Sequence, residues 1–142
     1  MMSTEENRTI VRRVTSEVVS DGNLAAADEL IAPNYVYHGT GVPDMHGVEG
    51  FKQVIAMYRT ALPDLQLTIE DMIAEGDKVA TRFVVRGTHR GPLLDVAPTG
   101  KQITVAGIFI SRIVGGKIAE EWENLDALGM MHQLGAIPGP TR

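Results

Sequence analysis

The sequence contains no cysteine, which excludes disulfide bonds, thiolate nucleophiles and cysteine-ligated metals. Aromatic residues are also few, at 5% of the 142 residues, with a single tryptophan. No apolar run is long enough to span a membrane, and the polar, acidic start Met1–Glu6 does not resemble a secretory signal. We therefore expect a cytoplasmic protein with no membrane partner.

Positive charge is sparse as well. The 13 Lys and Arg residues are scattered among 18 Asp and Glu residues, giving a net charge of −5. A nucleic-acid partner requires a basic surface, so we expect no nucleic acid to bind. None of the four histidines has the i,i+4 spacing of a helical metal pair, which predicts no metal site. There is also no Gly-x-Ser-x-Gly motif to supply a serine nucleophile.

The remaining composition is that of an ordinary globular domain, with 44% hydrophobic and 22% charged residues. The length fits one domain covering residues 1–142. In the first half, apolar residues at helical spacing predict helices over 5–20, 24–31 and 48–62. A short strand is predicted over 34–38, followed by a loop over 39–47.

From residue 65 onward the apolar period changes from helical spacing to two. Strands are predicted over 65–70, 79–85, 102–114 and 117–125, with turns at 75–77 and at Gly115–Gly116. A last helix begins near Asp126, and residues 135–140 are expected to be irregular. This order predicts an α+β domain in which helices pack on one face of a curved antiparallel sheet.

The run that follows Gly116 mixes acids with the only tryptophan. A two-residue turn at 115–116 would pair Phe109 with Trp122, Gly107 with Asn124 and Val105 with Asp126. Ile118, Glu120, Trp122, Asn124 and Asp126 would then share one face. Apolar walls beside carboxylates indicate a pocket, although Trp122 and Phe109 are equally consistent with plain core.

Three titratable residues are candidates for chemistry. Asp126 precedes a helix, so it can be an N-cap or, in an apolar pocket that raises its pKa, a general acid/base, and the two roles need not exclude each other. His38 ends a strand, and His89 follows the alternation of Phe83 and Val85, so both histidines could face the concave side of the sheet. A lone histidine in such a place is also consistent with a structural role.

Several local motifs, in this order, resemble those of the SnoaL-like polyketide cyclases in the nuclear transport factor 2-like superfamily. These motifs are Pro33–His38, Pro63–Leu65, Gly76–Ala80, Gly87–Gly91, Pro98–Lys101, Gly116–Trp122, Asp126–Gly129 and Gln133–Gly135.

The resemblance implies a cone-shaped domain with a pocket at its mouth. It also implies an aspartate acid/base that closes a polyketide ring without a metal or an organic cofactor. Asp126 is similar to that aspartate, and His38 and His89 match histidines of the family pattern.

The first hypothesis is a cofactor-free enzyme that acts on a small apolar carbonyl compound. Asp126, His38 and His89 would be catalytic, and the expected substrate-binding residues are Tyr35, Tyr58, Phe109, Trp122 and Asn124. The alternatives are an epoxide hydrolase that uses Arg82 with Asp126, or a module that only binds a ligand or dimerises. Apolar residues on both faces of the strands between 65 and 125 predict a homodimer.

Overall fold

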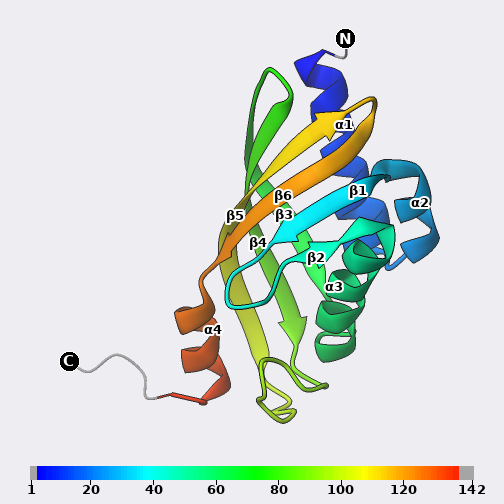
Figure 1. Ribbon diagram of the computed structural model, residues 1–142. Helices are drawn as coiled ribbons and strands as arrows, with labels where there is room; N and C mark the ends of the chain where they lie inside the picture. The colour runs from blue at the N-terminus through cyan, green and yellow to red at the C-terminus, as the bar shows by residue number, and fades with distance from the viewer. Residues whose placement is uncertain (1–2, 138–142) are drawn as a thin grey trace.

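Figure 1 shows the computed structural model, which describes residues 3–137. Its helices are α1 (Thr4–Arg13), α2 (Ala27–Leu30), α3 (Gly47–Ala61) and α4 (Ala127–Leu134), with a π-helix η1 (Val14–Ser20) and a 3₁₀ turn η2 (Leu24–Ala26). Within these residues, no helix combines the length and the apolar character needed to cross a membrane. The predicted helices over 5–20, 24–31 and 48–62 are confirmed to within a residue or two at their ends.

The strands are β1 (Ile31–His38), β2 (Met45–His46), β3 (Gln66–Glu75), β4 (Lys78–Thr88), β5 (Gln102–Val114) and β6 (Lys117–Leu125). They form one sheet in the order β2-β1-β6-β5-β4-β3. The sheet is mixed, because β1 pairs parallel to β6 while every other pair is antiparallel. The predicted α+β class is confirmed, and the prediction of a wholly antiparallel sheet is corrected at β1.

The N-terminal helix begins at a capping box. The Ser3 hydroxyl accepts a hydrogen bond from the Glu6 amide at 3.0 Å, and the Ser3 amide donates to the Glu6 carboxylate at 3.1 Å. α1 then widens into η1, where the Asp21 amide reaches the Ser16 carbonyl five residues back, at 2.9 Å. The wider turn places Val14 and Thr15, neighbours in the sequence, against the same interior cavity.

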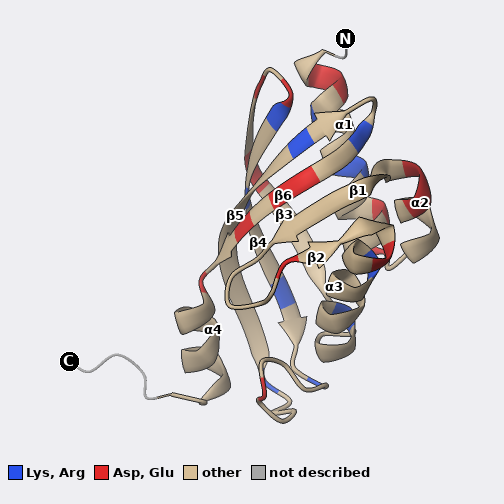
Figure 2. Cartoon of the chain, viewed as in Figure 1, with Lys and Arg blue, Asp and Glu red and all other residues tan. Residues whose placement is uncertain are grey.

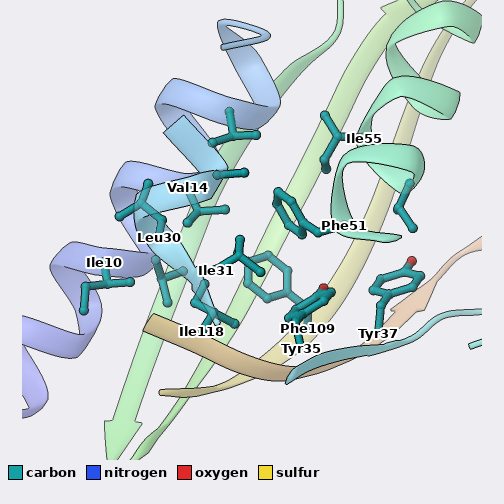
Figure 3. Close-up of a cluster of buried hydrophobic side chains, with 14 of the residues drawn as sticks. Ile10, Val14, Leu30, Ile31, Tyr35, Tyr37, Phe51, Ile55, Phe109 and Ile118 are labelled. Carbon is teal, nitrogen blue, oxygen red and sulfur yellow. The ribbon is translucent and has the colours of Figure 1, made fainter. Parts of the chain in front are cut away.

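The helices cover the concave face of the curved sheet, and the main core lies between them (Figure 1). In Figure 3, Ile10 from α1 and Val14 from η1 lie in one cluster with Ile31 and Ile118 from the paired strands β1 and β6. A smaller apolar cluster that includes Leu62 and Met130 lies where the end of α3, the β4–β5 loop and α4 come together. Residues 138–140 of the expected irregular tail fall outside the described residues.

A bulge early in β6 changes which residues face the interior. Val114 pairs with Lys117 as predicted, but the register shifts between Arg112 and Ile113, so that Ile113 pairs with Ile118 and Arg112 with Glu120. Ala119 is the additional residue, and it is buried like Ile118 beside it.

The predicted register beyond this point is therefore wrong by one residue. Phe109 pairs with Glu123, Gly107 with Leu125 and Ile110 with Trp122. Because side chains alternate along a strand, a shift of one residue exchanges the two faces. Glu121, Glu123 and Leu125 point into the interior, and Trp122 lies on the outer face.

Candidate functional site

A cavity of about 90 Å³ lies between the concave face of the sheet and the helices η1 and α3. Its walls are mostly apolar and come from both clusters of the core. The titratable and hydroxyl side chains that line it are Thr15, Tyr35, Tyr37, Tyr58, Arg59, Glu121 and Glu123. An apolar cavity with a few convergent polar groups is typical of a small-molecule site.

The first carboxyl group in this cavity, that of Glu121, is fully engaged. The Tyr35 hydroxyl donates to its Oε1 at 2.8 Å, and the Ser111 hydroxyl donates to its Oε2 at 2.7 Å. All three side chains are buried, with Tyr35 only 1% exposed. Phe51 packs edge-on against the Tyr35 ring and fixes the position of the phenol.

The second carboxyl group, that of Glu123, is half engaged. The Tyr37 hydroxyl donates to its Oε1 at 2.5 Å. Among residues 3–137, this is the one hydrogen bond that the Glu123 carboxyl group makes, and its Oε2 takes no part in it. Figure 3 shows Tyr35 and Tyr37 side by side along β1, two residues apart. The spacing of two on β1 thus matches the spacing of two on the parallel strand β6.

Burial sets the protonation of this cluster. Desolvation raises the pKa of Glu121 from the ordinary value of 4.5 to about 7, against the lowering effect of the Ser111 and Tyr35 hydrogen bonds. Burial also raises the pKa of Glu123, while the Tyr37 hydroxyl opposes the rise. Desolvation raises the pKa of Tyr35, Tyr37 and Tyr58, so all three phenols are neutral donors at pH 7.

The nearest cation does not neutralise these acids. Arg59 lines the cavity, but its Nη1 donates to the carbonyls of Val19 at 2.9 Å and Ser20 at 2.8 Å, where η1 ends. These bonds tie α3 to the end of η1. The two glutamates therefore face a largely apolar space with only tyrosine and serine hydroxyls as donors, an arrangement suited to moving protons near neutral pH.

Of the five predicted substrate-binding residues, Tyr35, Tyr58 and Phe109 line the cavity. Trp122 and Asn124 do not line it, because the β6 bulge turns them to the outer face. Their predicted place as cavity walls is corrected.

His38 lies on the outer side of the sheet. Its Nε2 is 2.7 Å from a Glu120 carboxylate oxygen, and its Nδ1 is 3.0 Å from an oxygen of Asp44. The ring stacks on Trp122 with 5.7 Å between centroids. The bond to Glu120 is the main reason that the pKa of His38 is raised. The ring is not among the groups that line the cavity, so its catalytic role stays a prediction.

His89 is completely buried beneath the β4–β5 loop. The Thr99 backbone amide donates to its Nδ1 at 3.1 Å, so the ring proton must sit on Nε2. That nitrogen has no hydrogen-bond partner among residues 3–137. The contact anchors the loop, and His89 does not line the cavity. Its catalytic role likewise stays a prediction.

Asp126 is the N-cap of α4. Its carboxylate accepts from the Gly129 amide at 2.9 Å, its side chain is exposed, and it is not among the cavity-lining residues. The predicted cap is confirmed, whereas the predicted acid/base role remains a prediction. Arg82 is exposed on the outer face of β4, away from the cavity, which removes the basis of the epoxide hydrolase alternative.

No group of three or more His, Asp or Glu side chains in the part of the chain that the structure describes could hold a metal ion.

The family model of the SnoaL-like polyketide cyclases matches residues 9–134. The chain belongs to this family.

The curated relatives of this SnoaL-like protein include two ester cyclases. Nogalonic acid methyl ester cyclase of Streptomyces nogalater is 30% identical over 116 residues, covering 80% of this chain and 87% of the relative. Aklanonic acid methyl ester cyclase DnrD of Streptomyces peucetius is 30% identical over 136 residues, covering 93% and 92%. These relatives support the prediction of an enzyme.

The fold agrees with that of solved structures. TsrD from Streptomyces laurentii superposes with a TM-score of 0.87 at 28% identity, and the match covers 96% of this chain and 100% of TsrD.

Sequence reasoning missed the residues that carry acid groups into the cavity of this SnoaL-like protein, namely Glu121 and Glu123, and it missed Tyr37, the donor to Glu123. The available signal was the apolar pair Ile118–Ala119, which breaks the alternation of the strand just after the turn. Two consecutive buried residues mark a bulge, and a bulge there exchanges the faces of everything that follows.

Proposed function

We propose that this protein is a cofactor-free cyclase or isomerase that uses Glu123 and Glu121 for acid/base chemistry on a carbonyl compound. The observation that carries the proposal is the pair of carboxyl groups, each held by a tyrosine hydroxyl, inside an apolar cavity. The curated relatives, which are methyl ester cyclases, favour the cyclase alternative.

The hydrogen bonds divide the work between the two acids. Glu121 has both oxygens engaged, which fits a group that holds charge and geometry. Glu123 keeps Oε2 free, so it is the candidate base. In the proposed reaction Glu123 takes a proton from the carbon next to a carbonyl, and a neutral phenol stabilises the enolate oxygen. The enolate carbon then attacks a second carbonyl of the same molecule, and the resulting alkoxide takes the proton back.

This reaction is an isomerisation, so no co-substrate is consumed and the product has the mass of the substrate. Tyr58 is a suitable enolate donor, because its ring lines the cavity and burial raises its pKa, which keeps the hydroxyl protonated. Asp126 remains the competing assignment for the acid/base, since the family resemblance points to it. The two assignments make different predictions for single variants.

The test uses nogalonic acid methyl ester and aklanonic acid methyl ester, with ring closure followed by chromatography and mass spectrometry. We expect Glu123→Gln to lower turnover by about 10²–10⁴-fold, the usual contribution of a positioned general base. Asp126→Asn, which preserves a helix cap, is the matched variant. Loss of turnover in Asp126→Asn with normal turnover in Glu123→Gln would reverse the assignment, and inactivity of the wild-type protein on both esters would reject these substrates.

We also propose that the outer face of the sheet binds a second copy of the chain. A row of side chains, Ile73, Ala80, Ile110 and Trp122, crosses β3 to β6 in register. Ile73 is 67% exposed and Ile108, one row away, is 49% exposed. Exposed apolar stripes of this kind are typical of protein interfaces.

A two-fold symmetric partner would cover this stripe. In Figure 2, basic residues lie on β4 and β5 and acidic residues lie on β6. On the outer face, β4 carries Lys78, Arg82 and Arg86, whereas Glu120 of β6 is already paired with Arg112 and His38 of the same chain. A two-fold axis through the apolar centre of β5 would therefore bring the apolar stripes of the two copies together.

Sedimentation equilibrium tests the dimer. We expect the wild-type protein to sediment at twice the chain mass and Ile110→Lys to sediment as a monomer. Leu128→Lys is the control, because Leu128 is 63% exposed but lies on α4, outside the row. A monomeric wild-type protein would contradict the proposal.

A cytoplasmic location also remains a proposal from the absence of cysteine, and fractionation of cells that express the protein would test it.

A further inference from the structure

The chain leaves β1 after His38, and the glycine that follows is needed to make space for the Tyr37 side chain. A Cβ added to Gly39 would lie 2.4 Å from Cε2 and 2.5 Å from the hydroxyl oxygen of Tyr37. Real Cβ atoms essentially never approach a neighbour closer than 3.0 Å. Gly39 is not among the residues with positive φ, so its backbone does not demand glycine. The Tyr37 phenol reaches Glu123 because residue 39 has no side chain.

The next residue holds the backbone that carries the acid. The Thr40 hydroxyl donates to the Glu123 carbonyl at 3.1 Å and accepts from the Leu125 amide at 3.0 Å. Main-chain pairing between β1 and β6 ends at His38 and Trp122. The Thr40 side chain therefore continues the pairing beyond this point, with one hydrogen bond to Glu123 and one to Leu125. The carboxyl group of this Glu123 faces the cavity.

We infer that Gly39 and Thr40 are positioning residues that set the geometry of the Tyr37–Glu123 pair. Gly39 admits the phenol to its place beside the carboxylate, and Thr40 fixes the main chain that directly follows the Glu123 side chain. Neither residue lines the cavity, so neither contacts a ligand bound there. Their influence on chemistry rests on the proposed role of Glu123, whereas their influence on its hydrogen bond does not.

This role has a consequence for titration. The Tyr37 hydroxyl opposes the rise in the pKa of Glu123 that burial causes. A Cβ at residue 39 displaces the phenol and removes that donor, and the carboxyl group then holds its proton to higher pH. A purely structural role for Gly39 would change the stability of the protein without changing this pKa.

The experiment measures the pKa of Glu123 in the full chain by ¹³C NMR of protein labelled at the glutamate carboxyl carbons, with Glu123→Gln to assign the signal. We expect Gly39→Ala and Tyr37→Phe each to raise the pKa by about 1, the equivalent of one hydrogen bond. The double variant should show no further rise, because both changes remove the same bond. Gly39→Ala with an unchanged pKa in a folded protein would overturn the inference.

Thr40→Val tests the second half of the inference and remains informative if Gly39→Ala does not fold. Valine keeps the shape of threonine and removes both hydrogen bonds, so the pKa of Glu123 should change, and Thr40→Ser should restore it. Thr68→Val is the control, since Thr68 is exposed on β3. A Thr40→Val protein that titrates like wild type would refute the role of Thr40. No substrate is present, so failure of the proposed reaction leaves these results interpretable.

Discussion

Replacement of Glu121 by glutamine should stabilise the protein in a pH-dependent way. In the folded state the pKa of Glu121 is about 7, against 4.5 for an ordinary glutamate. Between these values the folded chain keeps a proton that the unfolded chain has released. The contribution of Glu121 to stability is therefore most favourable below pH 4.5, and it falls as the pH rises towards 7.

The difference between the two pKa values corresponds to roughly 3 kcal/mol of stability lost by pH 8, at about 1.4 kcal/mol for each pH unit. Glutamine has no charge to bury, and its amide can still accept from Tyr35 and donate to the Ser111 hydroxyl. We expect Glu121→Gln to match the wild type near pH 4.5 and to exceed it by roughly 3 kcal/mol at pH 8.

The assay is urea unfolding followed by circular dichroism at several pH values and one protein concentration. Glu120→Gln is the matched control, because Glu120 is the next residue and faces the opposite side. The hydrogen bond from His38 lowers the pKa of Glu120. Glu120→Gln should therefore lower the stability of the protein above pH 4.5, whereas Glu121→Gln should raise it. A constant difference between Glu121→Gln and wild type from pH 4.5 to 8 would refute the reasoning.

Three further changes test other parts of the structure. Asp126→Ala should lower stability by about 1 kcal/mol in urea unfolding, because the Gly129 amide loses its cap, and Asp126→Asn should retain most of that stability. His38→Gln should destabilise the protein below pH 6.5, and the difference from wild type should shrink as the pH rises through the raised pKa of His38, because neutral histidine bonds Glu120 more weakly. Tyr58→Phe should lower kcat by about 10²-fold with little change in KM if its hydroxyl stabilises the enolate, whereas an equal kcat would assign the ring to packing alone.

Much of the fold was predictable from the sequence because the apolar spacing is strong. The change from helical period to alternation after residue 65 places β4 and β5 within three residues of their observed bounds, whereas the predicted strand over 65–70 ends five residues before β3 does. The parallel pairing of β1 with β6 was not predictable from local pattern. This pairing joins two segments that are separated in the sequence by α3, β3, β4 and β5. Only the packing of the whole chain selects it.

The candidate site was predicted only in part, and one residue explains most of the difference. Tyr35, Tyr58 and Phe109 were expected to line a pocket, and they do. Ala119 is the extra residue of the bulge, and a small apolar side chain gives little warning of it in the sequence. Strict alternation therefore predicted that Glu120 and Trp122 face the interior. The residues that do so are their neighbours Glu121 and Glu123.

In each of the two pairs that meet in the cavity, the tyrosine and its glutamate are 86 residues apart along the chain. Contacts between such distant segments close a long loop, which has an entropic cost that local contacts do not have. During synthesis the phenols emerge with the first long strand, but the carboxyl groups arrive only with the last one. A nascent chain that stops short of Glu121 has neither acid to place in the cavity. Acquisition of the site thus coincides with completion of the sheet, since β6 lies between β1 and β5.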